Sequence, residues 1–145
     1  MGTAVAWPLS DNGHRISLVG THLDREIIEE ARKNNRHPRL KRQLPGGISA
    51  YHIEDIREAI GDADLIVSGV NSWGVEWIGE TLAQALERGG DVIAVTKGLR
   101  ADEKGDVEIF PRVVASYFPE SLRRESNFMA IGGPCIAGEL AGRRQ

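Results

Sequence analysis

The residue best placed for chemistry is a lysine that directly follows an apolar stretch. Lys97 comes after "DVIAVT", which is typical of a strand buried within a sheet. Ligands of open α/β sheets bind at the carboxyl ends of the strands, and Lys97 is expected at such an end. An ammonium there can hold a phosphate group as a point charge and favour negative charge that develops on a carbonyl oxygen. Position alone favours the plainer interpretation, a solvated lysine after a strand.

A second candidate is the segment "GGPCIAGE" near the end of the chain. Gly133 is followed by Pro134, which suits the first turn of a helix, and the free amide groups of such a helix attract anions or substrate hydroxyls. Without further context the segment is merely a strand-to-helix turn. Cys135 is the only cysteine. Because no base partner is identifiable, a small buried hydrophobe is a better interpretation of Cys135 than a reactive nucleophile.

Asn71 and Ser72 form a third candidate, because they end the apolar strand "ADLIVSGV". They are expected at the same edge as Lys97 and are candidate neighbours of a bound ligand. Trp73 and Trp77 lie four positions apart on the following helix, so simple packing is the stronger interpretation for at least one of them.

Alternating strands and helices must position these residues. The apolar pattern predicts strands at 15–20, 48–53, 63–70, 91–99 and 127–133, and helices at 2–11, 24–33, 54–60, 74–89, 109–118 and from 134. The apolar stretches in 63–70 and 91–99 are continuous, which predicts strands buried on both faces. This alternation indicates an α/β fold with a doubly wound, mostly parallel sheet, and the length of 145 residues fits one domain, residues 1–145.

The first helix begins in the middle of a motif. In such folds the first strand runs into G-x-G-x-x-G, whose last glycine lies just inside the first helix. Gly2 fits that last glycine, because small residues, a helix stop at Asn12-Gly13 and a strand follow it. On this hypothesis the first strand and the start of the glycine-rich loop are missing, which leaves strands 15–20 and 63–70 each without one neighbour. We therefore expect the natural protein to extend at both ends.

Composition excludes several classes of function. A net charge of −3 with 27% charged residues gives little bulk attraction to nucleic acid or to anionic membranes. The apolar stretches are too short for membrane insertion, no secretory leader is evident, and a single cysteine fits a reducing cytoplasm. The four histidines show no metal-ligand spacing, so no metal is expected. The basic run 32–42 is by default a solvated loop, and the second choice is a rim over an adenosine phosphate.

Four segments, taken in order, resemble the NAD(P)-dependent glycerol-3-phosphate dehydrogenases: "MGTAVAWPLSDNGHRISLVGTHLD", "NRHPRL", "VTKGL" and "GGPCIAGELA". The resemblance spans essentially the whole chain. It implies a Rossmann-like cofactor domain and a helical C-terminal domain, absent here, that brings the main catalytic lysine. It also implies hydride transfer between NAD(P)H and dihydroxyacetone phosphate or sn-glycerol 3-phosphate in the complete enzyme, a homo-oligomer, and no measurable turnover by these 145 residues alone.

The resemblance also implies roles for individual residues. Lys97 would contact both substrate and cofactor and polarise the substrate, and Gly133 and Cys135 would touch the glycerol phosphate. Relatives often have Ser or Thr where Cys135 stands, and a thiol makes a weaker hydrogen bond, so reduced substrate affinity is expected. The resemblance and the positions of the strand ends together predict which residues lie at the cofactor. They are Met1, Gly2, Thr21, Asn71, Ser72, Lys97 and Ala137.

The choice between NAD and NADP depends on the end of the strand 15–20. NAD-preferring domains commonly place an acid there to accept from the ribose 2′-hydroxyl, whereas this chain has Thr21 and His22. The missing acid favours NADP, with Arg25, His22 or the later basic loop as partners of the 2′-phosphate. Asp24, which with Thr21 also resembles a helix capping box, keeps NAD open.

Two other functions fit the same pattern. One is a related reductase of the ketopantoate or 6-phosphogluconate dehydrogenase type, which shares the N-terminal architecture. The other is a cofactor-binding or assembly fragment without catalysis, which associates through exposed strand edges.

Overall fold

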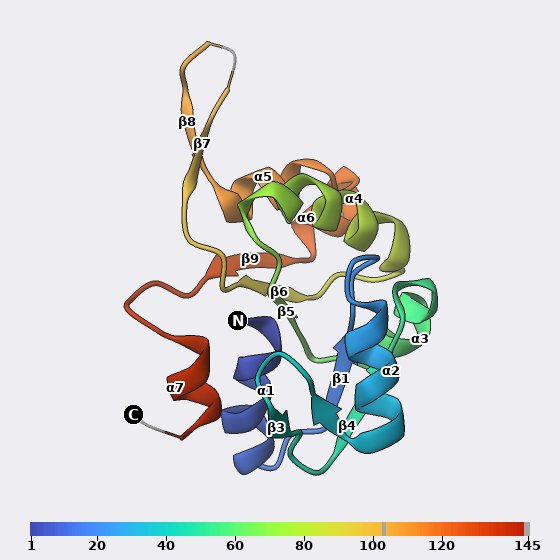
Figure 1. Cartoon of the computed structure of the whole chain (residues 1–145). Helices are drawn as coiled ribbons and strands as arrows, with labels where there is room; N and C mark the ends of the chain where they lie inside the picture. Colours follow the sequence, from blue (N-terminus) through green and yellow to red (C-terminus); the bar gives the residue numbers. More distant parts are fainter. Residues whose placement is uncertain (103, 144–145) are drawn as a thin grey trace. The chain divides into compact units, whose positions relative to one another are not determined.

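A computed structural model describes residues 1–102 and 104–143 (Figure 1). The contacts between residues divide the chain into two compact units. The first unit contains Met1, residues 3–62 and the segment from Cys135 onward, and the second contains Gly2 and residues 63–134.

Two parallel strands form the sheet of the first unit. β1 (Ile16–Val19) pairs with β4 (Ile48–Tyr51), with Ile16 opposite Ile48. The helices associated with this unit are α1 (Gly2–Asp11), α2 (Arg25–Asn34), η1 (Ile53–Asp55), α3 (Ile56–Ile60) and α7 (Ala137–Ala141). A small antiparallel hairpin joins β2 (Arg36–His37) to β3 (Arg42–Gln43).

The core of the first unit lies where α1, α2, the hairpin and α7 meet. Its buried residues are Ala4, Trp7, Ala31, Leu44 and Ala141. α1 contributes Ala4 and Trp7 to this core, and the helix ends just before Gly13, which takes a φ of 82°, a conformation that glycine adopts without strain. The predicted bounds of α1 and its stop are therefore confirmed.

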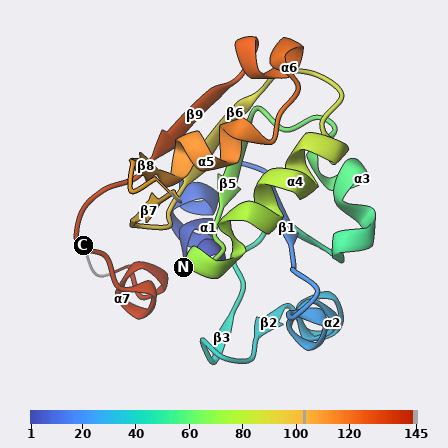
Figure 2. The ribbon, with the colours of Figure 1, turned by 90° about the horizontal axis from the view of Figure 1, so that it is seen from above.

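The second unit is built on a three-stranded parallel sheet in the order β5-β6-β9. β5 (Leu65–Ser68), β6 (Asp91–Ala94) and β9 (Asn127–Ala130) lie side by side in Figure 2. The remaining elements are η2 (Ser72–Gly74), α4 (Val75–Ala85), β7 (Leu99–Ala101), β8 (Val107–Ile109), α5 (Phe110–Ser116) and α6 (Glu120–Arg124).

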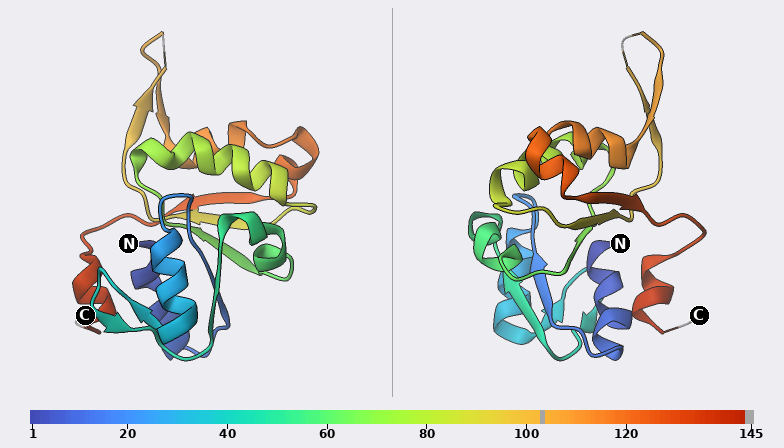
Figure 3. Two further views of the ribbon diagram at one scale, coloured as in Figure 1. Left: turned by 45° about the vertical axis from the view of Figure 1, so that its right-hand side comes forward. Right: turned by 180° about the vertical axis from the view of Figure 1, so that it is seen from behind.

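Helices α4 and α5 cover one face of this sheet, as Figure 3 shows from two sides. Leu82 of α4 and Val113 of α5 are almost completely buried. The helices approach closely because Gly79 has no side chain: an added Cβ there would lie 2.7 Å from the Tyr117 ring. Burial of such aliphatic side chains, at about 1.5–3 kcal/mol each, holds the helices on the sheet.

The alternation predicted from the sequence is confirmed, with three corrections. Neither strand is buried on both faces as predicted: in β6 only Val92 and Ala94, which share one face, are buried, and in β5 Leu65 is 44% exposed. The strand predicted at 91–99 ends at Ala94, since Gly98 with a φ of 144° breaks the extended path. Pro134 does not stand in a first helical turn, because α7 begins only at Ala137.

The sequence predicts that β1 and β5 each lack one neighbouring strand. In the described residues β1 hydrogen-bonds to β4 only, and β5 to β6 only. In the same part of the chain, no helix combines the length and the apolar character needed to cross a bilayer.

Candidate functional site

The carboxyl ends of the second unit's three strands meet in register, and three candidate residues stand just beyond them. Each lies three positions after the last paired residue of its strand: Asn71 after Ser68, Lys97 after Ala94, and Gly133 after Ala130. Because parallel strands end at the same edge of a sheet, the structure brings these residues to one edge, where ligands of open α/β sheets bind.

Lys97 is held at this edge by its neighbours on the sheet. Its ammonium donates a hydrogen bond to the carbonyl oxygen of Gly133, which links the segment after β6 to the segment after β9. The side chain remains exposed. An ammonium has three donors, so two N–H groups of Lys97 are left for a ligand. Lys97 is therefore an exposed cation whose ammonium contacts the segment after β9.

Glycine is required on both sides of this contact. Gly98 has a φ of 144° and Gly133 a φ of 115°, conformations that residues with a side chain rarely adopt. A Cβ on Gly98 would also lie 2.7 Å from the Phe110 ring. The two glycines thus set the path of the backbone that presents Lys97 and the Gly133 carbonyl.

Asn71 and Ser72 belong to a tight turn at the end of β5. The Asn71 side-chain oxygen accepts from the Gly74 amide at 3.1 Å, which fixes the single turn of η2. The Thr96 hydroxyl donates to the carbonyl of Val70, so this turn is tied to the residue before Lys97. The sequence correctly assigned Asn71 to the edge, and its capping contact explains why an asparagine suits the position.

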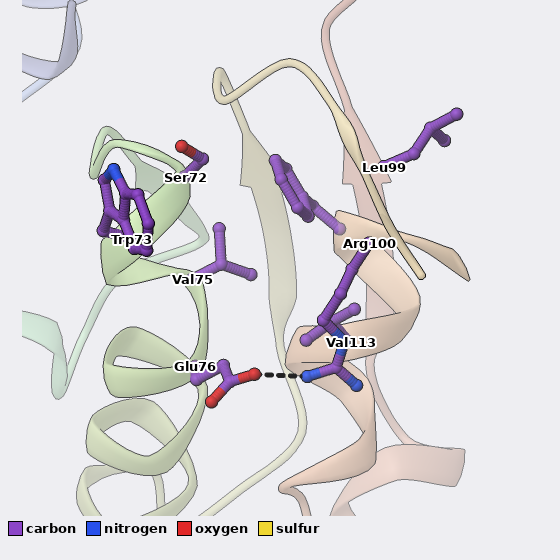
Figure 4. Close-up of a pocket in the computed structure, with 8 residues that line it drawn as sticks. Ser72, Trp73, Val75, Glu76, Leu99, Arg100 and Val113 are labelled. Carbon is purple, nitrogen blue, oxygen red and sulfur yellow. Dashed lines mark hydrogen bonds and ion pairs between the residues drawn. The ribbon is translucent and has the colours of Figure 1, made fainter. Parts of the chain in front are cut away.

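A pocket of about 400 Å³ lies next to this edge, between the start of α4, β7 and α5 (Figure 4). Its lining residues are Ser72, Trp73, Val75, Glu76, Leu99, Arg100, Phe110 and Val113. The sequence did not reveal this pocket, because it is formed partly by β7, which was not predicted. Trp73, which borders the pocket, is 93% exposed, so the packing interpretation does not apply to it.

Arg100 crosses this pocket between two carboxylates. One guanidinium nitrogen pairs with Glu76, as Figure 4 shows, and another lies 3.4 Å from Glu108. The hydrogen bond to Glu76 raises the pKa of Arg100 above its ordinary value. Because two acids balance this guanidinium, it offers little net attraction to an anion. We take Arg100 as the residue that ties the β7–β8 hairpin to α4.

In the first unit, β1 ends in a turn made by Thr21 and Asp24. The Asp24 carboxylate accepts from the Thr21 amide at 3.1 Å and from the Thr21 hydroxyl at 2.6 Å. The bond from the Thr21 amide to the Asp24 carboxylate is one of the two bonds of the predicted capping box. The second bond differs, because the Thr21 hydroxyl accepts from the Leu23 amide at 3.2 Å and α2 begins only at Arg25.

Two arginines near this turn are already paired. Arg25 forms an ion pair with Glu54. Arg32 bonds the Ala50 carbonyl at 2.8 Å and lies 3.2 Å from Asp55. Both are less free to meet a phosphate than the sequence alone indicates.

The remaining candidate residues of the first unit are Met1, Cys135 and Ala137. Met1 is 42% exposed and its carbonyl starts the bonds of α1, accepting from Ala4 and Val5. Cys135 is exposed, so its interpretation as a buried hydrophobe is wrong. Ala137 begins the five-residue α7 and packs partly against the core of the first unit.

Gly2 behaves as the last glycine of the motif should. It groups with the second unit, where a Cβ added to it would lie 3.2 Å from the Cα of Gly69. A Cβ on Gly69 would lie only 2.3 Å from the Cα of Gly2. This contact between two backbones fits the close packing that the third glycine of a dinucleotide-binding loop provides.

Comparison with known proteins agrees with this geometry. The family model for the N-terminus of NAD-dependent glycerol-3-phosphate dehydrogenase matches residues 1–145. The NADP(+)-dependent glycerol-3-phosphate dehydrogenase of Archaeoglobus fulgidus is 31% identical over 143 residues, which are 99% of this chain and 41% of that protein. The glycerol-3-phosphate dehydrogenase [NAD(P)+] of Streptococcus sanguinis is 30% identical over 140 residues, 95% of this chain and 38% of that protein.

Solved structures show the same fold. The chain matches the glycerol-3-phosphate dehydrogenase of Coxiella burnetii with a TM-score of 0.72 at 23% identity, covering 97% of this chain and 40% of that one. The yeast enzyme gives a TM-score of 0.74 at 18% identity, covering 97% of this chain and 41% of that one. The chain thus spans about two fifths of the length of these relatives. Its Rossmann-like fold is established, and the chain belongs to the family of the NAD-dependent glycerol-3-phosphate dehydrogenase N-terminus.

Proposed function

We propose that this chain is the cofactor-binding part of an NAD(P)-dependent glycerol-3-phosphate dehydrogenase. In the complete enzyme, hydride passes between NAD(P)H and dihydroxyacetone phosphate or sn-glycerol 3-phosphate. The observation that carries the proposal is Lys97, held at the carboxyl edge of the sheet by the Gly133 carbonyl. The family match favours this activity over the ketopantoate and 6-phosphogluconate types.

Lys97 supplies positive charge at this edge. Two of its N–H groups are left to bind the phosphate or the carbonyl oxygen of the substrate, and negative charge that develops on that oxygen is thereby stabilised. The backbone at Gly133 approaches the same place without a side chain in the way. Cys135 is exposed and can donate only a weak thiol hydrogen bond, which lowers affinity for the glycerol phosphate.

The residues present fit a dinucleotide. Gly2 lets backbone approach backbone at the start of α1, and the side chain of the N-cap residue, Met1, leaves the first amide groups uncapped, so that they suit a diphosphate. In the second unit, Asn71 and Ser72 would lie by the nicotinamide end, and in the first unit Thr21 would lie by the adenosine. Ala137 would line the cofactor as well. The nicotinamide supplies or accepts the hydride when bound.

We propose that a helical domain outside this chain completes the enzyme with the main catalytic lysine. The proposal also includes a homo-oligomer and a cytoplasmic location for the complete protein. The proposed small-molecule partner is a phosphorylated three-carbon substrate. The proposal includes neither binding of nucleic acid nor insertion into a membrane.

An assay of the full-length protein tests this function. We expect oxidation of NADPH or NADH with dihydroxyacetone phosphate and none with ketopantoate, and no reduction of NADP or NAD with 6-phosphogluconate. The 145-residue chain alone should bind cofactor without turnover. Preference for either of the other two substrates, or robust turnover by the short chain, would contradict the proposal.

One observation favours a second candidate. β1 and β5 each pair with one strand in the described part of the chain, and such open edges can recruit other strands. A non-catalytic assembly fragment would self-associate through them. Sedimentation at several concentrations, combined with cofactor titration, separates the two: association without nucleotide binding supports the assembly role.

A further inference from the structure

Lys97 lies in a short segment that backbone hydrogen bonds do not hold. The last such bond before it runs from the Val95 amide to the Ser68 carbonyl at 3.0 Å, and strand pairing begins again only at Leu99, in β7. In the described part of the chain, the backbone groups of Thr96 and Lys97 form no hydrogen bond with other backbone groups. Hydrogen bonds from side chains therefore set where this segment lies.

The side chains of Thr96 and Lys97 join the segment to the neighbouring strand ends. β6 lies between β5 and β9. The Thr96 hydroxyl donates to the carbonyl of Val70, which follows β5. The Lys97 ammonium donates to the carbonyl of Gly133, which follows β9. Two consecutive residues thus connect the three strand ends, with one hydrogen bond on each side.

These two bonds differ in how well they can fix the backbone. Lys97 reaches Gly133 through a long, flexible side chain whose ammonium is exposed, and a bound ligand competes for the same N–H groups. Thr96 is β-branched and only partly exposed, so the direction of its hydroxyl is restricted by χ1 alone. The Thr96 bond is therefore the one that can hold the backbone while the Lys97 side chain turns towards a substrate.

The carbonyl that accepts from Thr96 belongs to a turn with bonds of its own. The side-chain oxygen of Asn71 accepts from the Gly74 amide at 3.1 Å, directly after Val70. A Cβ added to Gly74 would lie 3.0 Å from the Cβ of Val70, so the turn packs closely on this residue. Loss of the Thr96 hydroxyl should therefore leave the turn in place and release the segment that carries Lys97.

We propose that Thr96 is a positioning residue, whose bond to the Val70 carbonyl fixes the backbone from which Lys97 reaches the substrate. This inference rests on the proposed function, in which the Lys97 ammonium binds the phosphate or the carbonyl oxygen of the substrate. In this role Thr96 acts through Lys97 and need not touch substrate or cofactor. Small displacements of a group that acts on the reacting atoms slow a reaction markedly.

Steady-state kinetics of the full-length enzyme test the proposal. Thr96→Val removes the hydroxyl and keeps the shape of the side chain. We expect kcat/KM for dihydroxyacetone phosphate to fall by about 10-fold, with a raised KM for this substrate, as displacement of a binding group does. The Kd of the cofactor that supports the reaction should change less than about twofold, because the turn after β5 keeps its own bonds.

Two further variants at the same position show whether the hydroxyl is responsible. Thr96→Ser keeps the donor and should restore kcat/KM to within about threefold of wild type. Thr96→Ala removes the donor without placing a methyl group against the Val70 carbonyl. It should reproduce the loss even if Thr96→Val does not fold.

Thr81 offers the matched control. Its hydroxyl is also partly buried and donates to a backbone carbonyl, that of Trp77 at 2.7 Å, but it lies in the second half of α4. Thr81→Val therefore removes the same chemical group away from the strand ends. It should leave kcat/KM within about twofold of wild type.

A double-mutant cycle with Lys97→Met separates positioning from a general effect on the fold. If Thr96 acts through Lys97, Thr96→Val should lower kcat/KM by less than about twofold in the Lys97→Met background. If Thr96 acts on the fold alone, the losses caused by the two substitutions multiply.

Three results would overturn the role of Thr96 and leave the proposed function intact. They are full activity in Thr96→Val, no recovery in Thr96→Ser, and losses that multiply in the double variant. Unchanged activity in Lys97→Met would refute the contact of Lys97 with the substrate, and this role with it. A wild-type enzyme that oxidises neither NADPH nor NADH with dihydroxyacetone phosphate would refute the proposed function itself.

Discussion

Lys97 is the residue on which the proposed chemistry depends most. Replacement by Met keeps the length and the apolar stem of the side chain but removes the charge and its donors. We expect kcat/KM for dihydroxyacetone phosphate in the full-length enzyme to fall by about 100-fold or more, as it does when a group that stabilises a developing oxyanion is lost. Steady-state kinetics measure this loss.

A lysine from the β7–β8 turn provides the control. Lys104→Met removes the same charge from an exposed position away from the edge of the sheet and should leave kcat/KM within about twofold of wild type, as surface changes do. If Lys97→Met behaves like Lys104→Met, Lys97 does not contact the substrate.

His37 links the stability of the first unit to pH. Burial lowers its pKa, and the charge of Arg39 lowers it further, so the folded chain keeps the imidazole neutral. The unfolded chain takes up a proton as the pH falls through about 6.5. The unfolded state then binds more protons, so the free energy of unfolding is greatest above that pH and falls below it.

Urea unfolding at pH 7.5 and pH 5.5 measures this effect. His37→Asn keeps an oxygen that can accept from the Leu40 amide but does not titrate, so its midpoint should depend less on pH than that of the wild type. Asp11 and Glu54, whose pKa values are held low by hydrogen bonds, titrate below this window. An unchanged pH dependence in the variant would assign the effect to another group.

Among the elements, the backbone path of the segment between β6 and β7 depends on Gly98. Gly98→Ala would force a side chain into a φ of 144° and against the Phe110 ring. Strain of this kind costs about 1–3 kcal/mol, and the displaced backbone carries Lys97 with it. We therefore expect a lower thermal midpoint together with reduced activity.

Gly46→Ala is the control for this change. An added Cβ at Gly46 meets no atom within 4 Å and the backbone there is not left-handed, so stability should change little. Equal effects of the two substitutions would show that the Gly98 conformation is not needed.

The sequence predicted the elements that apolar patterning controls. Helices α1, α2, α4 and α5 and strands β1, β4, β5, β6 and β9 were all expected near their observed positions. The two hairpins, β2–β3 and β7–β8, and the short α6 were not, because their residues are mostly exposed and follow no apolar period. The strands end earlier than predicted, but the placement of Asn71 and Lys97 beyond β5 and β6 was predictable, since the carboxyl ends of parallel strands meet at one edge of a sheet.

Other parts of the site could not be predicted. The exposure of Cys135 and the late start of α7 depend on the path of residues 132–136, which form neither helix nor strand. The pairing of Arg25 with Glu54 joins positions 29 apart in sequence, and no local pattern indicates it.

Across the whole molecule, the strands should differ in how well their amides are protected from hydrogen exchange. β6 hydrogen-bonds to a neighbour on both sides, whereas β1 and β5 have one partner each in the described residues. Amide protection follows the free energy of local opening, so β6 peptides should exchange more slowly than peptides of β1 or β5. Hydrogen exchange followed by mass spectrometry measures this order.

Binding of cofactor should change that order. If the strand ends of the second unit contact the cofactor, NADPH should slow exchange in the peptides that follow β5 and β6. Unchanged exchange in these peptides would contradict this expectation.

The contact between Gly2 and Gly69 has a consequence for the history of the family. A methyl group at position 69 would lie 2.3 Å from the other backbone, whereas one at position 2 would lie at 3.2 Å. An alanine at position 2 requires its neighbour to move by a few tenths of an ångström, whereas one at position 69 requires the facing backbone to move further. Across the family, glycine should therefore be kept more strictly at position 69 than at position 2.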